Sequence, residues 1–298
     1  MRKHRPDKGT ILLATDFSRP ARQVVPYALE LAARLNLSLT FVHVVKAPPG
    51  SEQWSPAARR SLGPLKTRAL LELGRLIRAA SERKVKADYR LLVGIPEDSI
   101  LKAAEDPAVI LLAVGTHGRT GWDRFRLGSV AEKLLRTAPC PVLTVRASDA
   151  EKAPRLSLSC ILVPTDFSAF SKAALEFAVG LAKQLRAKVV LLHVTEPSRA
   201  SRPESIQIMD PVRRRTDRLF QKFISACRAA EIISERIVRP GDPVKGILDQ
   251  VKRVKADLIV MGTQGRRGMK LLALGSVAAS VVRKVSCPVL VVKIPSTK

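Results

Sequence analysis

The chain has 298 residues, 46% of them hydrophobic, and its 52 Lys and Arg against 26 Asp and Glu give a formal net charge of +26. This length suits two domains of about 150 residues, each able to bury its own core. No uninterrupted apolar run of about 18 residues occurs, which excludes a transmembrane helix. The basic N-terminus is followed too soon by Asp16 to be a signal sequence, so we expect a globular cytoplasmic protein.

The four cysteines and the positive charge further limit the class of protein and its partners. Four dispersed cysteines without a Cys-x-x-Cys pair exclude a disulfide scaffold and predict buried, reduced thiols, with Cys140 and Cys287 at equivalent places in the two halves. The charge favours polyanionic partners such as nucleic acid, anionic lipid or nucleotides. The alternative, which is favoured, is a solvated, Arg-rich surface set by general composition. The run Arg213-Arg214-Arg215 is likewise expected on a solvated face rather than at a DNA contact, because consecutive helical residues point in different directions.

Apolar runs alternate with helical patterns along both halves of the chain. In the first half, strands are predicted at 10–14, 39–44, 87–93, 109–113 and 142–145, with helices at 20–35, 56–83, after 97 and from 128. In the second half, strands are predicted at 160–164, 189–194, 234–238, before 262 and at 289–292, with helices over 174–185, at 204–230, after 243 and from 275. Each half therefore has the pattern βαβαβαβαβ, which predicts a five-stranded, doubly wound parallel sheet flanked by helices.

The repeat also predicts the domain organisation. We expect a first domain at 1–146, a polar linker at 147–157 and a second domain at 158–298. The last strands, 142–145 and 289–292, are predicted to pair the two halves as an internal pseudo-dimer, because an apolar edge strand tends to be covered. Assembly of two chains into a homodimer is a second alternative.

A doubled glycine motif follows the fourth strand of each half. It has the spacing Gly-x2-Gly-x9-Gly-Ser and comprises Gly115, Gly118, Gly128 and Ser129, then Gly262, Gly265, Gly275 and Ser276. Glycine after a strand permits positive φ and close approach of a ligand, and Gly-Ser at a helix start is expected to supply free N–H groups and a capping hydroxyl. These features suit a phosphate. Tight turns alone are the alternative, which the second copy disfavours.

Polar residues also follow the first strand of each half. Asp16 and Asp166 are predicted at the carboxyl end of the sheet, where ligands of open α/β proteins bind, and Ser18 and Ser168 are predicted to begin the next helix. His43 and His193 end the second strands. With no Ser or Cys nucleophile nearby, a hydrogen-bonded packing role is favoured over catalysis.

Four features carry a family resemblance across both halves. They are Thr-Asp-Phe-Ser after the first strand, His-Val late in the second, glycine and proline after the third, and the doubled glycine spacing. With them the chain resembles the universal stress protein family, in its tandem form and its ATP-binding branch, whose fold is that of the adenine nucleotide alpha hydrolases.

The resemblance implies one ATP in each domain, with Mg²⁺ as an optional companion. It places Asp16 and Val44 at the adenine of the first site, and Gly115, Gly118, Gly128 and Ser129 at its ribose and phosphates. The second site would comprise Asp166, Val194, Gly262, Gly265, Gly275 and Ser276. One departure is Ala14, where the second half has Pro164.

Three function classes follow. The favoured one is a non-enzymatic ATP-binding module for stress response or signalling. A slow ATPase or self-phosphorylating enzyme, with Ser129 or Ser276 as acceptor, comes second, and a basic nucleic-acid-associated protein third. A P-loop NTPase is unsupported, because no Gly-x4-Gly-Lys-Ser/Thr sequence occurs. Basic residues within the glycine segments either neutralise the γ-phosphate, which is favoured, or belong to a broad basic surface that holds any polyanion: Arg119, Arg124, Arg126, Arg266, Arg267 and Lys270.

Overall fold

A computed structural model describes residues 9–46, 56–116, 127–146, 157–195, 206–265 and 274–294. The chain divides into two compact units, Met1–Leu156 and Ser157–Lys298. Each unit is described by itself.

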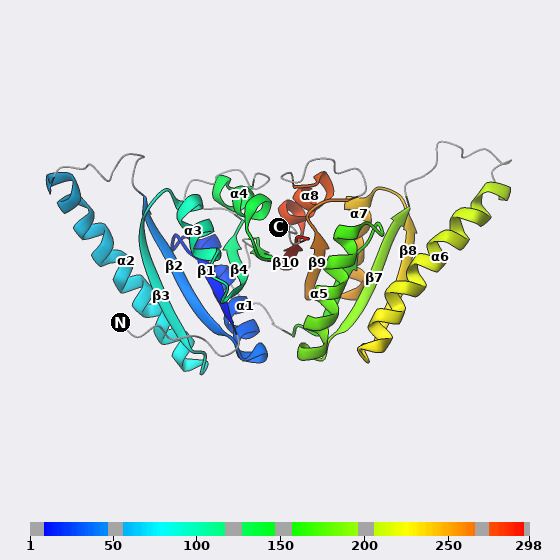
Figure 1. The fold of residues 1–298 in the computed structure, drawn as a ribbon, viewed down its shortest axis with the longest axis horizontal. Coiled ribbons are helices and arrows are strands. Elements are labelled where there is room, and N and C mark those ends of the chain that lie inside the picture. Colours follow the sequence, from blue (N-terminus) through cyan, green and yellow to red (C-terminus); the bar gives the residue numbers. More distant parts are fainter. Residues whose placement is uncertain are drawn as a thin grey trace. The chain divides into compact units, whose positions relative to one another are not determined.

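The first unit is a parallel sheet with helices on both faces (Figure 1). Its elements are β1 (Thr10–Ala14), α1 (Arg19–Leu35), β2 (Ser38–Lys46), α2 (Pro56–Glu82), β3 (Ala87–Gly94), α3 (Pro96–Ala104), β4 (Val109–Gly115), α4 (Ser129–Thr137) and β5 (Val142–Val145). The strand order is β3-β2-β1-β4-β5, and all pairs are parallel. The chain reverses direction across the sheet between β1 and β4, which is the place where such folds bind ligands.

The second unit repeats this arrangement. Its elements are β6 (Cys160–Pro164), α5 (Ala169–Leu185), β7 (Lys188–Thr195), α6 (Ile206–Ala229), β8 (Ser234–Pro240), α7 (Pro243–Val254), β9 (Leu258–Gly262), α8 (Ser276–Lys284) and β10 (Val289–Val292). The strand order β8-β7-β6-β9-β10 matches that of the first unit and is again parallel. The predicted pair of doubly wound domains is therefore confirmed.

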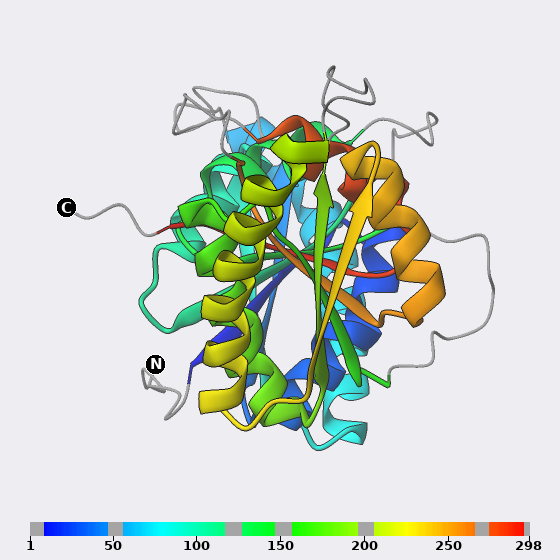
Figure 2. The same ribbon diagram turned by 90° about the vertical axis from the view of Figure 1, so that its right-hand side faces the viewer.

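The crossovers decide which helix covers which face. Because parallel crossovers are right-handed, reversing direction across the sheet moves the next helices to the other face. Figure 2 shows this in the second unit, where α6 in yellow and α7 in orange lie on opposite faces of the strands. Strands β1, β5 and β10 are buried along their whole length, as expected for a parallel sheet covered on both sides.

The predicted boundaries agree closely with the structure, except that α5 begins at Ala169, before the predicted 174, and several strands are longer than predicted. β1, β5, β6 and β10 begin and end where predicted. β3 and β8 continue to Gly94 and Pro240, because their ladders with β2 and β7 extend to Lys46↔Gly94 and Thr195↔Pro240. The apolar pattern ends before these residues, and only the pairing extends the strands.

The caps of α1 and α5 and three of the four cysteines also follow the predictions. Ser18 and Ser168 are the N-caps of α1 and α5, and their hydroxyls accept hydrogen bonds from the N–H groups of Ala21 and Ser171. All four cysteines are free; three are buried, and Cys287 is half-buried with its pKa raised to about 12 by burial. Within the described ranges, no helix has the length and apolar character needed to cross a membrane.

Candidate functional site

The turn after β1 holds Asp16 in a fixed conformation. The N–H of Ser18 donates to Oδ1 of Asp16 at 3.0 Å, and the N–H of Phe17 donates to Oγ1 of Thr15 at 3.0 Å. Phe17 has a φ of 63°, a left-handed conformation that non-glycine residues rarely adopt. Two local hydrogen bonds stabilise this turn, so Asp16 has a backbone role whatever it binds.

The turn after β6 has the same geometry. Ser168 N–H donates to Oδ1 of Asp166 at 3.0 Å, Phe167 N–H donates to Oγ1 of Thr165 at 2.9 Å, and Phe167 has a φ of 62°. The left-handed phenylalanine thus recurs in the second copy, where the local sequence Thr-Asp-Phe-Ser is the same.

His43 and His193 support these turns from the neighbouring strands. Nδ1 of His43 lies 2.8 Å from the carbonyl oxygen of Thr15, and Nδ1 of His193 lies 2.7 Å from that of Thr165. Each imidazole also packs on a phenylalanine of the turn, Phe17 at 4.4 Å and Phe167 at 4.7 Å between ring centroids. The favoured prediction of a hydrogen-bonded packing role is confirmed.

Gly115 and Gly262 end β4 and β9 against the first turn of a helix. A Cβ on Gly115 would lie 3.0–3.1 Å from backbone atoms of Pro20 and Ala21, and one on Gly262 would lie 2.8 Å from backbone atoms of Phe170. Neither glycine has positive φ, nor do Gly128, Gly265 and Gly275. The positive φ that glycine permits is therefore not adopted at these positions, and close strand–helix packing is the reason for glycine at the first two.

The helices after the glycine segments begin in a way that differs from the prediction. Gly128 and Gly275 are the N-caps of α4 and α8, and Ser129 and Ser276 are the first helical residues, so the expected capping hydroxyl is wrong. The N–H of Gly128 donates to the carbonyl of Thr116 at 2.8 Å. Helix geometry gives the next three N–H groups, those of residues 129–131, no acceptor within the helix. These free N–H groups and the helix dipole make the N-terminus of α4 favourable for an anion.

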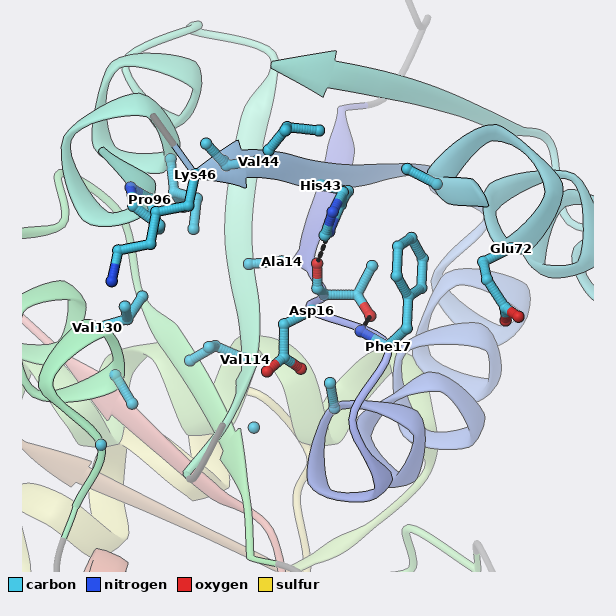
Figure 3. Close-up of a pocket in the computed structure, with 18 of the residues that line it drawn as sticks. Ala14, Asp16, Phe17, His43, Val44, Lys46, Glu72, Pro96, Val114 and Val130 are labelled. Atoms are coloured by element: carbon cyan, nitrogen blue, oxygen red, sulfur yellow. Dashed lines mark hydrogen bonds between the residues drawn. The ribbon is translucent and has the colours of Figure 1, made fainter. Parts of the chain in front are cut away.

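A cavity of about 700 Å³ opens at the carboxyl ends of β1, β2 and β4. Predicted site residues that line it are Asp16, Val44, Gly115, Gly128 and Ser129. In Figure 3 the carboxylate of Asp16 points away from His43, toward the side of the cavity where Val114 lies. This volume is in the range of small-molecule sites. Gly118 and the predicted arginines Arg119, Arg124 and Arg126 lie outside the described residues.

Helix α2 forms a wall of the cavity that sequence reasoning missed. Its lining residues are Leu65, Arg68, Ala69 and Glu72, and further lining residues include Arg22 of α1, Lys46 of β2 and Pro96 and Ile100 of α3. Glu72 forms ion pairs with Arg22 at 3.5 Å and Arg75 at 2.7 Å. The α2 residues are spaced i, i+3, i+4 and i+7, the signal of one helix face. Because charged and apolar residues alternate on that face of α2, its sequence pattern does not indicate a binding surface.

The second unit brings several predicted residues together at the ends of β6 and β9. A Cβ on Gly265 would lie 2.7 Å from Oδ2 of Asp166, so this glycine lies directly against the carboxylate. A Cβ on Gly275 would lie 3.1 Å from the carbonyl oxygen of Thr263. Val194 instead packs toward α7, where a Cβ on Gly246 would lie 2.8 Å from Cγ2 of Val194. Arg266, Arg267 and Lys270 lie outside the described residues.

Comparison with known proteins agrees with this geometry. Residues 9–146 and 159–293 match the Universal stress protein family. A universal stress protein of Mycobacterium tuberculosis is 24% identical over 302 residues, which cover 98% of this chain and 99% of the relative. One of Methanocaldococcus jannaschii is 32% identical over 146 residues, which cover 47% of this chain and 84% of the relative.

A solved structure shows the same fold over nearly the whole chain. The crystal structure of a universal stress protein from Archaeoglobus fulgidus has a TM-score of 0.73 at 23% identity and covers 96% of this chain and 99% of its own. Another solved universal stress protein is a complex with cAMP, at 26% identity and a TM-score of 0.35, covering 46% of this chain and 97% of its own.

Proposed function

Because this chain belongs to the universal stress protein family, with one family domain in each half, we propose that it is an ATP-binding module for stress response or signalling. The observation that carries the proposal is the cavity of about 700 Å³, which is lined by five residues of the first predicted site: Asp16, Val44, Gly115, Gly128 and Ser129. The second unit carries the equivalent residues at matching places: Asp166 follows β6, Gly262 ends β9, Gly265 follows β9, and Ser276 begins α8. The proposal therefore includes one nucleotide site in each domain.

The lining of the first cavity suits the two ends of a nucleotide. Ala14, Val44, Val114 and Ile100 offer apolar walls to a planar base. The first turn of α4 offers backbone N–H groups to phosphate oxygens, which the helix dipole also favours. In this proposal the base and the phosphates of one nucleotide contact separate parts of the same cavity.

Asp16 can serve the turn and the base together. Its Oδ1 already accepts the N–H of Ser18, but an ionised carboxylate has about four acceptor positions. An amino group of adenine can therefore donate to the same side chain. A hydrogen bond to a charged group contributes about 1.5–3 kcal/mol, so its loss is measurable.

The test is Asp16→Asn, with ATP and inorganic tripolyphosphate titrated calorimetrically into the full chain. Asparagine keeps the oxygen that accepts the Ser18 N–H and removes the charge, so the turn is preserved. We expect the affinity of the first site for ATP to fall by about tenfold or more, and that for tripolyphosphate to stay unchanged. Asp88→Asn, at an exposed position on β3 outside the cavity lining, is the matched control.

An equal loss for both ligands would show that Asp16 supports only the backbone turn. Phosphate release, followed in the same samples, separates a binding module from a slow ATPase. Pairing of the two domains through their last strands stays a prediction.

A further inference from the structure

Lys46 is a charged residue of the cavity to which neither the motif nor the family resemblance assigns a role. It ends β2 and lines the cavity together with Ser129, Val130 and Ala131 of the first turn of α4. In Figure 3 its side chain extends in the direction of Val130. A cation and a helix N-terminus therefore face the same part of the cavity.

The charges around the cavity are unevenly compensated. The carboxylate of Glu72 forms ion pairs with Arg22 and Arg75, which compensate its charge. Among residues whose positions the structure gives, Lys46 forms no ion pair with a carboxylate. Its charge is thus not neutralised by a described neighbour, and a bound anion would be a favourable partner.

The second half carries the opposite charge at this position. Val45 and Lys46 follow Val44 at the end of β2, whereas Thr195 and Glu196 follow Val194 at the end of β7. The two turns after β1 and β6 are otherwise alike to the level of single hydrogen bonds. The equivalent sequence position thus holds lysine in the first half and glutamate in the second, and Glu196 lies outside the described residues.

We propose that Lys46 makes the first site selective for nucleotides with two or three phosphates, and that the second site lacks this selectivity. The ammonium group binds the terminal phosphate oxygens, while the first turn of α4 binds those closer to the ribose. At the equivalent sequence position the second half has Glu196, so it lacks this positive charge. This inference rests on the proposed function and adds the class of nucleotide that each site prefers.

The experiment compares ATP, ADP and AMP titrated into the full chain, its Lys46→Met variant and its Lys46→Glu variant. Methionine keeps the apolar stem of lysine and removes the charge. We expect Lys46→Met to lower the ratio of ATP to AMP affinity at the first site by about tenfold, with AMP affinity unchanged. Lys46→Glu should lower the ratio further, and Glu196→Lys should raise it at the second site.

Two additions make the result specific. A Gly265→Val background confines binding to the first site, because the new side chain would meet Asp166. Lys102→Met, at an exposed position of α3 that does not line the cavity, controls for the loss of one positive charge and should leave the ratio unchanged.

An unchanged ratio in Lys46→Met, or equal losses for ATP and AMP, would overturn the selectivity and leave nucleotide binding standing. Failure of the unaltered chain to bind any of the three nucleotides would overturn both. If Gly265→Val does not fold, the two-site isotherms of the unaltered chain and of Lys46→Met still decide.

Discussion

At the scale of single residues, glycine at the end of β4 and β9 is explained by packing against a helix. Gly262 lies so close to α5 that a Cβ would be 2.8 Å from the carbonyl carbon and oxygen of Phe170. Backbone atoms cannot rotate away as a flexible side chain can. These glycines therefore set the distance between strand and helix, and with it the position of the turn that holds Asp166.

Gly262→Ala is expected to destabilise the second unit. The added methyl group must displace the first turn of α5, and overpacking of this kind costs about 1–3 kcal/mol. Urea unfolding followed by circular dichroism measures the change. The matched control is Gly180→Ala, at an exposed position inside α5 with no atom within 4 Å of its Cβ, which should stabilise by about 0.5–1 kcal/mol. Equal effects of the two variants would contradict the packing explanation.

At the scale of elements, Asp257 connects the start of β6 to the loop before β9. Its carboxylate accepts hydrogen bonds from Ser157 Oγ at 2.5 Å, from Ser159 N–H at 2.8 Å and from Cys160 N–H at 3.0 Å. Burial raises the pKa of Asp257, but these hydrogen bonds together outweigh it, and the pKa is lowered. The ionised carboxylate therefore stabilises the beginning of the second unit.

This arrangement predicts a pH dependence of stability. Because the folded-state pKa of Asp257 lies below its ordinary value of about 4, its contribution is present above that value. It is lost as the pH falls through the lower, folded-state pKa. At pH 7, Asp257→Asn should lower the free energy of unfolding of the second unit by about 1 kcal/mol.

The difference between Asp257→Asn and the unaltered chain should shrink as both are unfolded in urea at successively lower pH. A difference that stays constant down to the acid limit would mean that the carboxylate charge does not stabilise this corner. Asp249→Asn, at a position of α7 for which the structure gives no such network, serves as the control.

At the scale of the whole molecule, the net charge of +26 has to be separated from the charge of the site. A broad basic surface binds any polyanion by releasing counterions, and such binding weakens steeply with salt. Contacts to a bound nucleotide are directional and partly shielded from solvent. Arg214 and Arg215 on α6 are exposed, as expected for the predicted solvated face.

Salt titrations distinguish the two uses of charge. Between about 50 mM and 200 mM salt, we expect ATP affinity to fall modestly and any DNA affinity to fall by about a thousandfold or more. Arg119→Ala combined with Arg266→Ala, at positions outside the described residues, should weaken ATP more than DNA. Parallel loss of both ligands would assign these arginines to the general basic surface.

The sequence by itself determined the order of the elements and the edge of the sheet where the site lies. Apolar runs mark the buried strands because both faces of a parallel sheet are covered. Parallel strands also present their carboxyl ends at one edge, so residues that follow different strands, such as Asp16 and Gly115, converge there. Ser18 and Ser168 were predictable as caps because capping is local.

Only the tertiary structure decided which distant elements meet at that edge. The contribution of α2 through Arg68 and Glu72 depends on how that helix crosses the sheet, which no local pattern encodes. The reason for Gly115 is a backbone contact with α1, about 95 residues earlier in the chain and brought close only by the order of the strands. The direction of Lys46 likewise follows from the place of β2 beside β1. Contacts between elements far apart in sequence depend on packing, and packing is fixed only when the whole unit has folded.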